Sequence, residues 1–127
     1  MSDIKIIRNN KRERFLKKTI VLILTNIAAI SFLTTGSAKL LGAESAIAMF
    51  DDIGIGQWFR YLTGSIEVIG TLLILIPPLV FWGALLLSLT MIGAILVHLF
   101  VLGGSPSIAM LLLIVTSTLM LLKPIKN

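Results

Sequence analysis

Four apolar runs take up most of this 127-residue chain, and they limit the folds that are open to it. They lie at about 19–41, 60–76, 79–102 and 106–122. An α-helix needs about 20 residues to cross the hydrocarbon core of a bilayer, with a range of about 17–25. The chain is 57% hydrophobic and 13% charged, against about 45–50% and about 25% in soluble domains. A chain of this size cannot bury so much apolar surface in water, which predicts an all-α integral membrane protein.

The breaks between the runs predict how the helices are connected. Pro77 and Pro78 end the second run, and Pro78 can also begin the third helix. Gly103 and Gly104 end the third run, and Pro106 suits the first position of a fourth helix. Connections this short place successive helices side by side and antiparallel. We therefore expect an antiparallel four-helix bundle in which flanking residues extend the short second and fourth runs.

The basic residues predict the orientation of the bundle. Seven of the 11 precede the first apolar run: Lys5, Arg8, Lys11, Arg12, Arg14, Lys17 and Lys18. With four spans, this segment shares a side with Lys123 and Lys126, whereas the opposite side holds only Lys39 and Arg60. Basic residues concentrate on the cytoplasmic side, so both termini are expected there. The predicted organisation is a basic tail at 1–18, a membrane domain at 19–123 and a short tail at 124–127.

Two other interpretations of the basic N-terminus are less favoured. The net charge of +5 does not indicate a nucleic-acid partner, because no basic helix face with interleaved aromatics follows it. A cleaved signal peptide would use the small residues at 36–38 as its cleavage site. The basic segment is long for a signal peptide and the apolar run is long enough to span a bilayer, which favours a retained helix.

Glu67 is the least expected residue within the apolar runs. On a helix it shares a face with a set of polar and small residues: Arg60, Thr63, Gly64, Gly70 and Thr71. The opposite face is apolar, so Glu67 should face other helices, and Gly64 and Gly70 would allow close helix packing. Trp58 and Tyr61, at the end of the 42–60 loop, are expected to anchor the outer interface.

Depth along the helices brings three more ionisable groups to the level of Glu67. Glu67 lies roughly 9 Å below Tyr61, and His98 lies roughly 6 Å from the outer end of the third helix. Lys39 and Arg60 stand at the outer ends of the first and second helices. These four groups predict a polar, ligand-binding or proton-exchanging pocket in the outer half of the bundle. The alternative is an interhelical ion pair that only fixes the packing.

The rest of the sequence excludes several kinds of chemistry. There is no cysteine, so disulfides, thiol redox chemistry and iron–sulfur clusters are excluded. The single histidine, His98, cannot supply a bis-histidine haem or a multi-histidine metal site within one chain. No catalytic or metal-binding motif is evident, and the chain is not expected to act as an enzyme alone.

Three segments resemble the DoxX-like family of small bacterial four-helix membrane proteins. They are TGSAKLLG at 35–42, FDDIGIGQWFRYLTGSIEVIGTLLILIP at 50–77 and TMIGAILVHLFVLGGSP at 90–106. The resemblance covers roughly 19–123 and leaves out the basic tail. It implies a location in the bacterial cytoplasmic (inner) membrane. It singles out Gly36, Lys39, Gly56, Arg60, Gly64, Glu67, Gly70 and His98, with Gly36 added to the helix-packing glycines.

The resemblance also implies a redox context. The name-giving member of the family is linked to thiosulfate:quinone oxidoreductase, and relatives are linked to membrane redox complexes. The resulting hypothesis is an accessory subunit that binds a small molecule or quinone in the outer pocket and serves a redox partner. One alternative is a structural scaffold for a partner complex. Another is a small proton-coupled transporter, although small multidrug resistance transporters carry their glutamate in the first helix. The expected partners are a membrane redox protein or further copies of the chain in a homo-oligomer.

Overall fold

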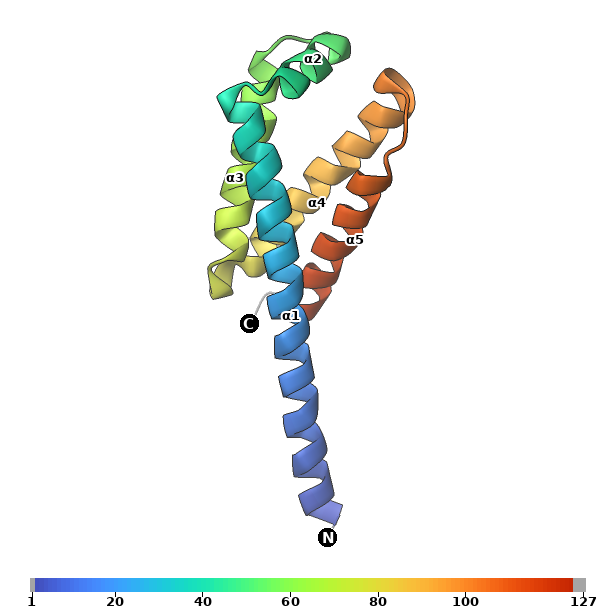
Figure 1. Cartoon of the computed structure of the whole chain (residues 1–127). Coiled ribbons are helices and arrows are strands. Elements are labelled where there is room, and N and C mark those ends of the chain that lie inside the picture. Colours follow the sequence, from blue (N-terminus) through green and yellow to red (C-terminus); the bar gives the residue numbers. More distant parts are fainter. Residues whose placement is uncertain (1, 125–127) are drawn as a thin grey trace.

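The computed structural model describes residues 2–124, and within them the chain is all α-helical, as predicted. The helices are α1 (Ser2–Leu41), α2 (Glu44–Ile53), α3 (Trp58–Ile74), α4 (Val80–Val97) and α5 (Ser107–Leu122). A 3₁₀ turn, η1 (Pro77–Leu79), precedes α4, and a π-helical turn, η2 (His98–Leu102), continues it. Figure 1 shows α1, α3, α4 and α5 running alternately up and down, with α2 across one end. Met1 and residues 125–127, including Lys126 of the predicted C-terminal tail, lie outside the described residues.

The long helices pack in a closed order around a small apolar core. Helix α1 contacts α3, α3 contacts α4, α4 contacts α5, and α5 returns to α1. The most deeply buried apolar side chains include Phe32 of α1, Ile74 of α3, Leu87 of α4 and Leu119 of α5. Towards the end that carries α2, the α4–α5 pair diverges from the α1–α3 pair (Figure 1). The core therefore lies near the middle of the helices and towards the opposite end.

Within residues 2–124, two helical segments are long and apolar enough to cross a membrane. They are Ser2–Leu41, with 40 residues, and Pro77–Leu102, with 26 residues. Helices α3 and α5 are shorter, with 17 and 16 residues. By length they stand at the lower limit of about 17–25 residues for a spanning helix. The short apolar runs at 60–76 and 106–122 therefore form short helices, α3 and α5.

The breaks between helices fall where the sequence placed them. Helix α3 ends at Ile74, just before the proline pair. Gly103 and Gly104 have φ angles of 70° and 81°, a left-handed conformation that glycine adopts without steric cost. Pro106 was predicted to begin the fourth helix, but it precedes the first helical residue, Ser107. The carbonyl of Pro106 still accepts the first helical hydrogen bond, so the difference is one residue.

The basic N-terminal segment continues the first membrane-length helix. Helix α1 begins at Ser2, so residue 18 lies inside an unbroken helix. Residues 2–18 are exposed and project beyond the other helices (Figure 1). Lysine, arginine and glutamate are good helix formers, and Glu13 precedes Lys17 by the four residues that favour pairing on a helix surface. Sequence reasoning assigned this segment by charge alone and did not predict its helix.

Glycines allow close approaches between helix backbones at two levels of α3. A Cβ added at Gly36 of α1 would lie 3.1 Å from the carbonyl oxygen of Gly64 in α3. One added at Gly83 of α4 would lie 2.8 Å from the carbonyl oxygen of Gly70 in α3. Helix α3 is therefore held at two levels by small residues, a common device in helix pairs. Gly83 is a partner that sequence reasoning missed.

Candidate functional site

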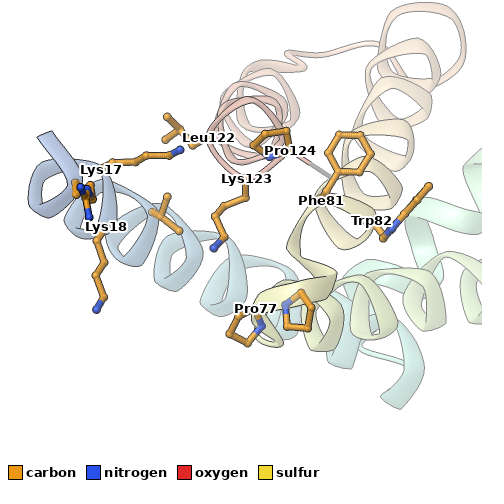
Figure 2. Close-up of a pocket in the computed structure, with 11 residues that line it drawn as sticks. Lys17, Lys18, Pro77, Phe81, Trp82, Leu122, Lys123 and Pro124 are labelled. Carbon is orange, nitrogen blue, oxygen red and sulfur yellow. The ribbon is translucent and has the colours of Figure 1, made fainter. Parts of the chain in front are cut away.

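Two cavities lie at opposite ends of the helices. The larger, of about 730 Å³, lies between α1, the Pro77 turn and the end of α5 (Figure 2). The smaller, of about 280 Å³, lies between the end of α1, α2, the N-terminal half of α3 and the end of α4. Its polar lining residues are Lys39, Thr63, Thr90 and His98, and the rest of its lining is mostly apolar, including Phe50, Ile66, Ala94 and Leu102. We call this smaller space the Lys39–His98 cavity.

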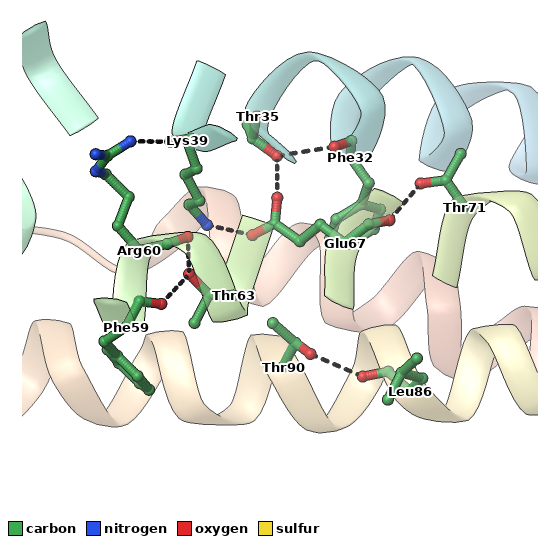
Figure 3. A network of polar contacts seen from close by, with 10 residues as sticks. All are labelled: Phe32, Thr35, Lys39, Phe59, Arg60, Thr63, Glu67, Thr71, Leu86 and Thr90. Atoms are coloured by element: carbon green, nitrogen blue, oxygen red, sulfur yellow. Dashed lines mark hydrogen bonds and ion pairs between the residues drawn. The ribbon is translucent and has the colours of Figure 1, made fainter. Parts of the chain in front are cut away.

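Glu67 is buried in α3 and points towards α1 (Figure 3). Its Oε1 pairs with Nζ of Lys39, in the last turn of α1. Its Oε2 accepts a hydrogen bond of 2.6 Å from the hydroxyl of Thr35, one turn before Lys39. The residue is 1% exposed, and an unpaired carboxylate at such a position would be costly. Both carboxylate oxygens have partners, which fixes the side chain against α1.

Arg60 is also buried, at 4% exposure, but it does not pair with Glu67. Its Nη1 donates to the backbone carbonyl of Lys39, and its Nε donates to Oε1 of Gln57 at 2.6 Å. Gln57 in turn donates to the carbonyl of Ile47 and to Asp51 in α2. The guanidinium satisfies a carbonyl at the C-terminus of α1, where a cation is electrostatically favoured. Arg60 therefore joins the end of α1 to α2 and α3.

His98 lines the Lys39–His98 cavity at the point where α4 passes into the π-helical turn. Its Nδ1 lies 2.9 Å from the carbonyl oxygen of Ala94. A carbonyl can only accept, so Nδ1 carries the hydrogen and Nε2 of the neutral ring is an acceptor. No protein partner for Nε2 is present among residues 2–124. Single π-turns are frequent at functional sites, and this one begins at the histidine.

The four predicted ionisable residues thus divide into two groups. Lys39, Arg60 and Glu67 form one connected network between α1 and α3, whereas His98 has no contact with that network. Of the four, Lys39 and His98 line the cavity, and Glu67 and Arg60 do not. Lys39 is therefore the link between the buried carboxylate and the open space. Its Nζ also lies 5.9 Å from the ring centroid of Phe50, within cation–π range.

Several polar residues in this region were not among the predicted site residues, although Thr63 was placed on the face of Glu67. Thr35 was identifiable, because it precedes Lys39 by four residues and so shares its helix face. Thr90 and Thr63 line the cavity, and Thr63 donates to carbonyls of its own helix. The role of Gln57 could not be predicted from the sequence, because its contacts with Ile47 and Asp51 depend on how α2 folds back over the end of α3. Trp58 and Tyr61 are more than half exposed, a position suited to interface anchors.

The comparison with protein families is decisive for the classification. A model of the DoxX-like family matches residues 23–121. This range includes every residue of the Glu67 network and of the Lys39–His98 cavity. The chain belongs to the DoxX-like family. The match leaves the projecting part of α1 outside.

One curated relative of this DoxX-like chain is a Bacillus subtilis (strain 168) protein named "Putative oxidoreductase CatD". It is 35% identical over 75 residues, which cover 59% of this chain. The aligned region spans 56% of the relative's own length, so the relative is matched over little more than half. No solved structure is significantly similar to this DoxX-like chain.

Proposed function

We propose that this DoxX-like chain is a four-span integral membrane protein of the bacterial cytoplasmic membrane with both termini in the cytoplasm. The distribution of polarity supports this placement. Arg60 and Glu67 are buried, whereas apolar residues such as Leu62, Ile69 and Leu72 on the same helix are exposed. Extensive exposed apolar surface of this kind is suited to lipid and not to water. Seven basic residues at the N-terminal end would remain on the cytoplasmic side.

Within that placement, the chain is an accessory subunit that holds a small amphipathic molecule, of which a quinone is the best fit. The observation that carries this proposal is the Lys39–His98 cavity: Lys39 of α1 and His98 at the end of α4 both line one space of about 280 Å³ with mostly apolar walls. A polar ring could occupy the space between Lys39 and His98, and an apolar tail could leave along the lipid-facing surface. Ligand sites commonly combine apolar walls with a few placed polar groups in this way.

The two polar groups offer complementary chemistry. The ammonium of Lys39 can donate to a carbonyl oxygen of the ligand, while Nε2 of His98 can accept from a hydroxyl. A quinone presents carbonyls and its reduced form presents hydroxyls, so both oxidation states have a partner. Glu67 would act through Lys39, by holding the ammonium in place and balancing its charge. The chain would bind and position the ligand, and a separate redox partner would exchange electrons with it.

The relative's name is consistent with an oxidoreductase context, but the alignment covers only 56% of that protein. The first experiment is therefore on the ligand itself. Native mass spectrometry of protein extracted gently from its own membrane would compare the wild type with Lys39→Met. Lys5→Met, in the projecting segment, is the matched control. We expect one defined small molecule on the wild type and the control and its loss from Lys39→Met. Equal lipid adducts on all three proteins would exclude the proposal.

The Glu67 network favours one further candidate, a scaffold that assembles a partner complex. Glu67 does not line the cavity, and its contacts with Lys39 and Thr35 join α1 to α3. Under this hypothesis the ion pair serves packing alone. Glu67→Gln would then lower thermal stability, and it would leave the retained small molecules unchanged. The accessory-subunit proposal instead expects both properties to change.

A further inference from the structure

The larger cavity gathers positive charge from helices that are distant in the sequence. Its lining includes Arg14, Lys17 and Lys18 of α1 together with Lys123, just past the end of α5. Figure 2 shows Lys123 extending between α1 and the Pro77 turn. No carboxylate lines the cavity in the part of the chain that the structure describes. The basic cavity, as we name it, therefore brings four cations together around about 730 Å³.

These cations have no counter-charge within the described protein. Among residues 2–124, the ion pair between Lys39 and Glu67 is the only one present. Glu13 is the acidic residue adjacent to Arg14 in the sequence, but it forms no ion pair. Arg14 is separated by three and four residues from Lys17 and Lys18, so the three share one helix face, where like charges are mildly destabilising. A bound anion would remove that repulsion.

The positive-inside rule by itself explains basic residues near a membrane, but not a cavity with this second wall. Beside the cations lie the apolar side chains of Val21, Phe81, Trp82 and Leu122, with the proline pair at the turn. Trp82 is half exposed, and tryptophan is favoured where hydrocarbon meets the polar headgroups. The cavity thus has a charged rim and an apolar wall. That combination suits a molecule with an anionic head and a hydrocarbon body.

We propose that the basic cavity binds an anionic phospholipid, with its headgroup phosphate among Lys17, Lys18 and Lys123 and an acyl chain along Phe81 and Trp82. Basic pockets between helices on the cytoplasmic side are suited to such headgroups. A free phosphate would use the cations but leave the apolar wall without a role. This inference depends on the membrane placement proposed above. It does not depend on any ligand of the Lys39–His98 cavity, which lies at the other end of the helices.

The position of Trp82 allows a direct test. The chain has two tryptophans, so Trp58→Phe leaves Trp82 as the only one. This protein would be placed in phosphatidylcholine vesicles containing a minor fraction of phosphatidylglycerol, with bromine on the acyl chains of either lipid. Bromine quenches nearby indole fluorescence, so the two series report which lipid occupies the cavity. We expect phosphatidylglycerol to be enriched beside Trp82 by about fivefold over random mixing at low salt.

Charge-matched variants separate the cavity from general surface attraction. Lys17→Gln/Lys18→Gln/Lys123→Gln removes three cations from the cavity, and Lys5→Gln/Arg8→Gln/Lys11→Gln removes three from the projecting part of α1. The first variant should abolish the enrichment, and the second should keep it. Lys123→Gln alone should lower the enrichment partly. Because Lys123 lies beyond the end of α5, this variant should fold normally even if the triple variant does not.

Three results would overturn the proposal. The first is quenching of the Trp58→Phe protein by each brominated lipid in proportion to its share of the bilayer, which would mean that the cavity does not select anionic lipid. The second is an equal loss in the two triple variants, which would indicate surface potential and not a cavity. The third is reversal of the enrichment by about 10 mM inorganic phosphate at constant ionic strength, which would indicate a free-anion site, since ionic strength already accounts for screening.

Discussion

Lys39 of α1 pairs with the buried carboxylate of Glu67 in α3 and at the same time lines the Lys39–His98 cavity. One side chain therefore couples helix packing to the space in which we propose that a ligand binds. The pair is asymmetric, because the side chain of Glu67 is 1% exposed and that of Lys39 is 19% exposed. Loss of Lys39 leaves a buried carboxylate, and loss of Glu67 leaves a partly exposed cation.

This asymmetry predicts the order of stability among variants of the pair. Lys39→Met should destabilise more than Glu67→Gln, with losses of about 1–3 kcal/mol in the unfolding free energy. The double variant should recover part of the sum, because neither charge is then left alone. Thermal unfolding of the four proteins in the same detergent checks this. Strictly additive losses would mean that the two groups do not interact in the folded protein.

The contact between Gly83 and Gly70 predicts a contrast between two alanine substitutions on α4. Gly83→Ala places a Cβ 2.8 Å from the Gly70 carbonyl oxygen, so α3 and α4 must separate, at a cost of about 1–3 kcal/mol. A Cβ at Gly93 meets no atom within 4 Å. Gly93→Ala should therefore be neutral or stabilise by up to about 1 kcal/mol through helix propensity. Parallel melting curves check this, and equal effects of the two substitutions would refute the close helix crossing.

Arg60 joins the end of α1 to α2, and its loss should loosen α2 locally. Its guanidinium donates from two different nitrogens, to the Lys39 carbonyl and to Gln57. Lysine has one nitrogen and cannot reproduce both bonds in this geometry. Arg60→Lys should therefore speed amide hydrogen exchange in α2 by about 5–30-fold, consistent with a loss of about 1–2 kcal/mol, while leaving the core of α4 and α5 protected. Faster exchange throughout the chain, or no change in α2, would contradict this role.

The sequence predicted the long helices and their breaks because those features depend on local chemistry. Apolar run length, the Pro77-Pro78 pair and the two glycines at 103–104 act within a few residues. Helix α2 was only partly foreseen. Ile47 and Phe50 of the 42–60 loop have the spacing of one helical face, but that spacing does not show where the chain turns at Gly54, whose φ is 84°. The helix at 2–18 was missed because the basic residues were interpreted only as a topology signal, and their ordinary helix propensity was not considered.

The sequence predicted where the ionisable residues lie along the helices, but not which of them form hydrogen bonds or ion pairs with one another. Depth and helix periodicity brought Lys39, Arg60 and Glu67 to one end of the bundle, where they do meet. Periodicity does not give the rotation of one helix relative to another. It therefore left open whether Lys39 or Arg60 would pair with the carboxylate of Glu67. It also could not show that His98 and Lys39 line one cavity, since that depends on how the α4–α5 pair diverges from the α1–α3 pair (Figure 1).

Gly93 offers the most direct test of whether the Lys39–His98 cavity holds a quinone-type molecule. Gly93 lines this cavity, and a side chain there meets open space, so Gly93→Leu should fill the cavity without disturbing the fold. The measurement is crosslinking of a photoreactive benzoquinone with an alkyl tail to protein in nanodiscs, with the labelled residues mapped by mass spectrometry.

We expect wild-type protein to be labelled at cavity residues such as Ile66 and Ala94, with competition by the untagged quinone. Gly93→Leu should retain its thermal stability and lose this labelling. Labelling of Gly93→Leu at the same residues, or labelling of the wild type only on the outer apolar surface, would contradict the account.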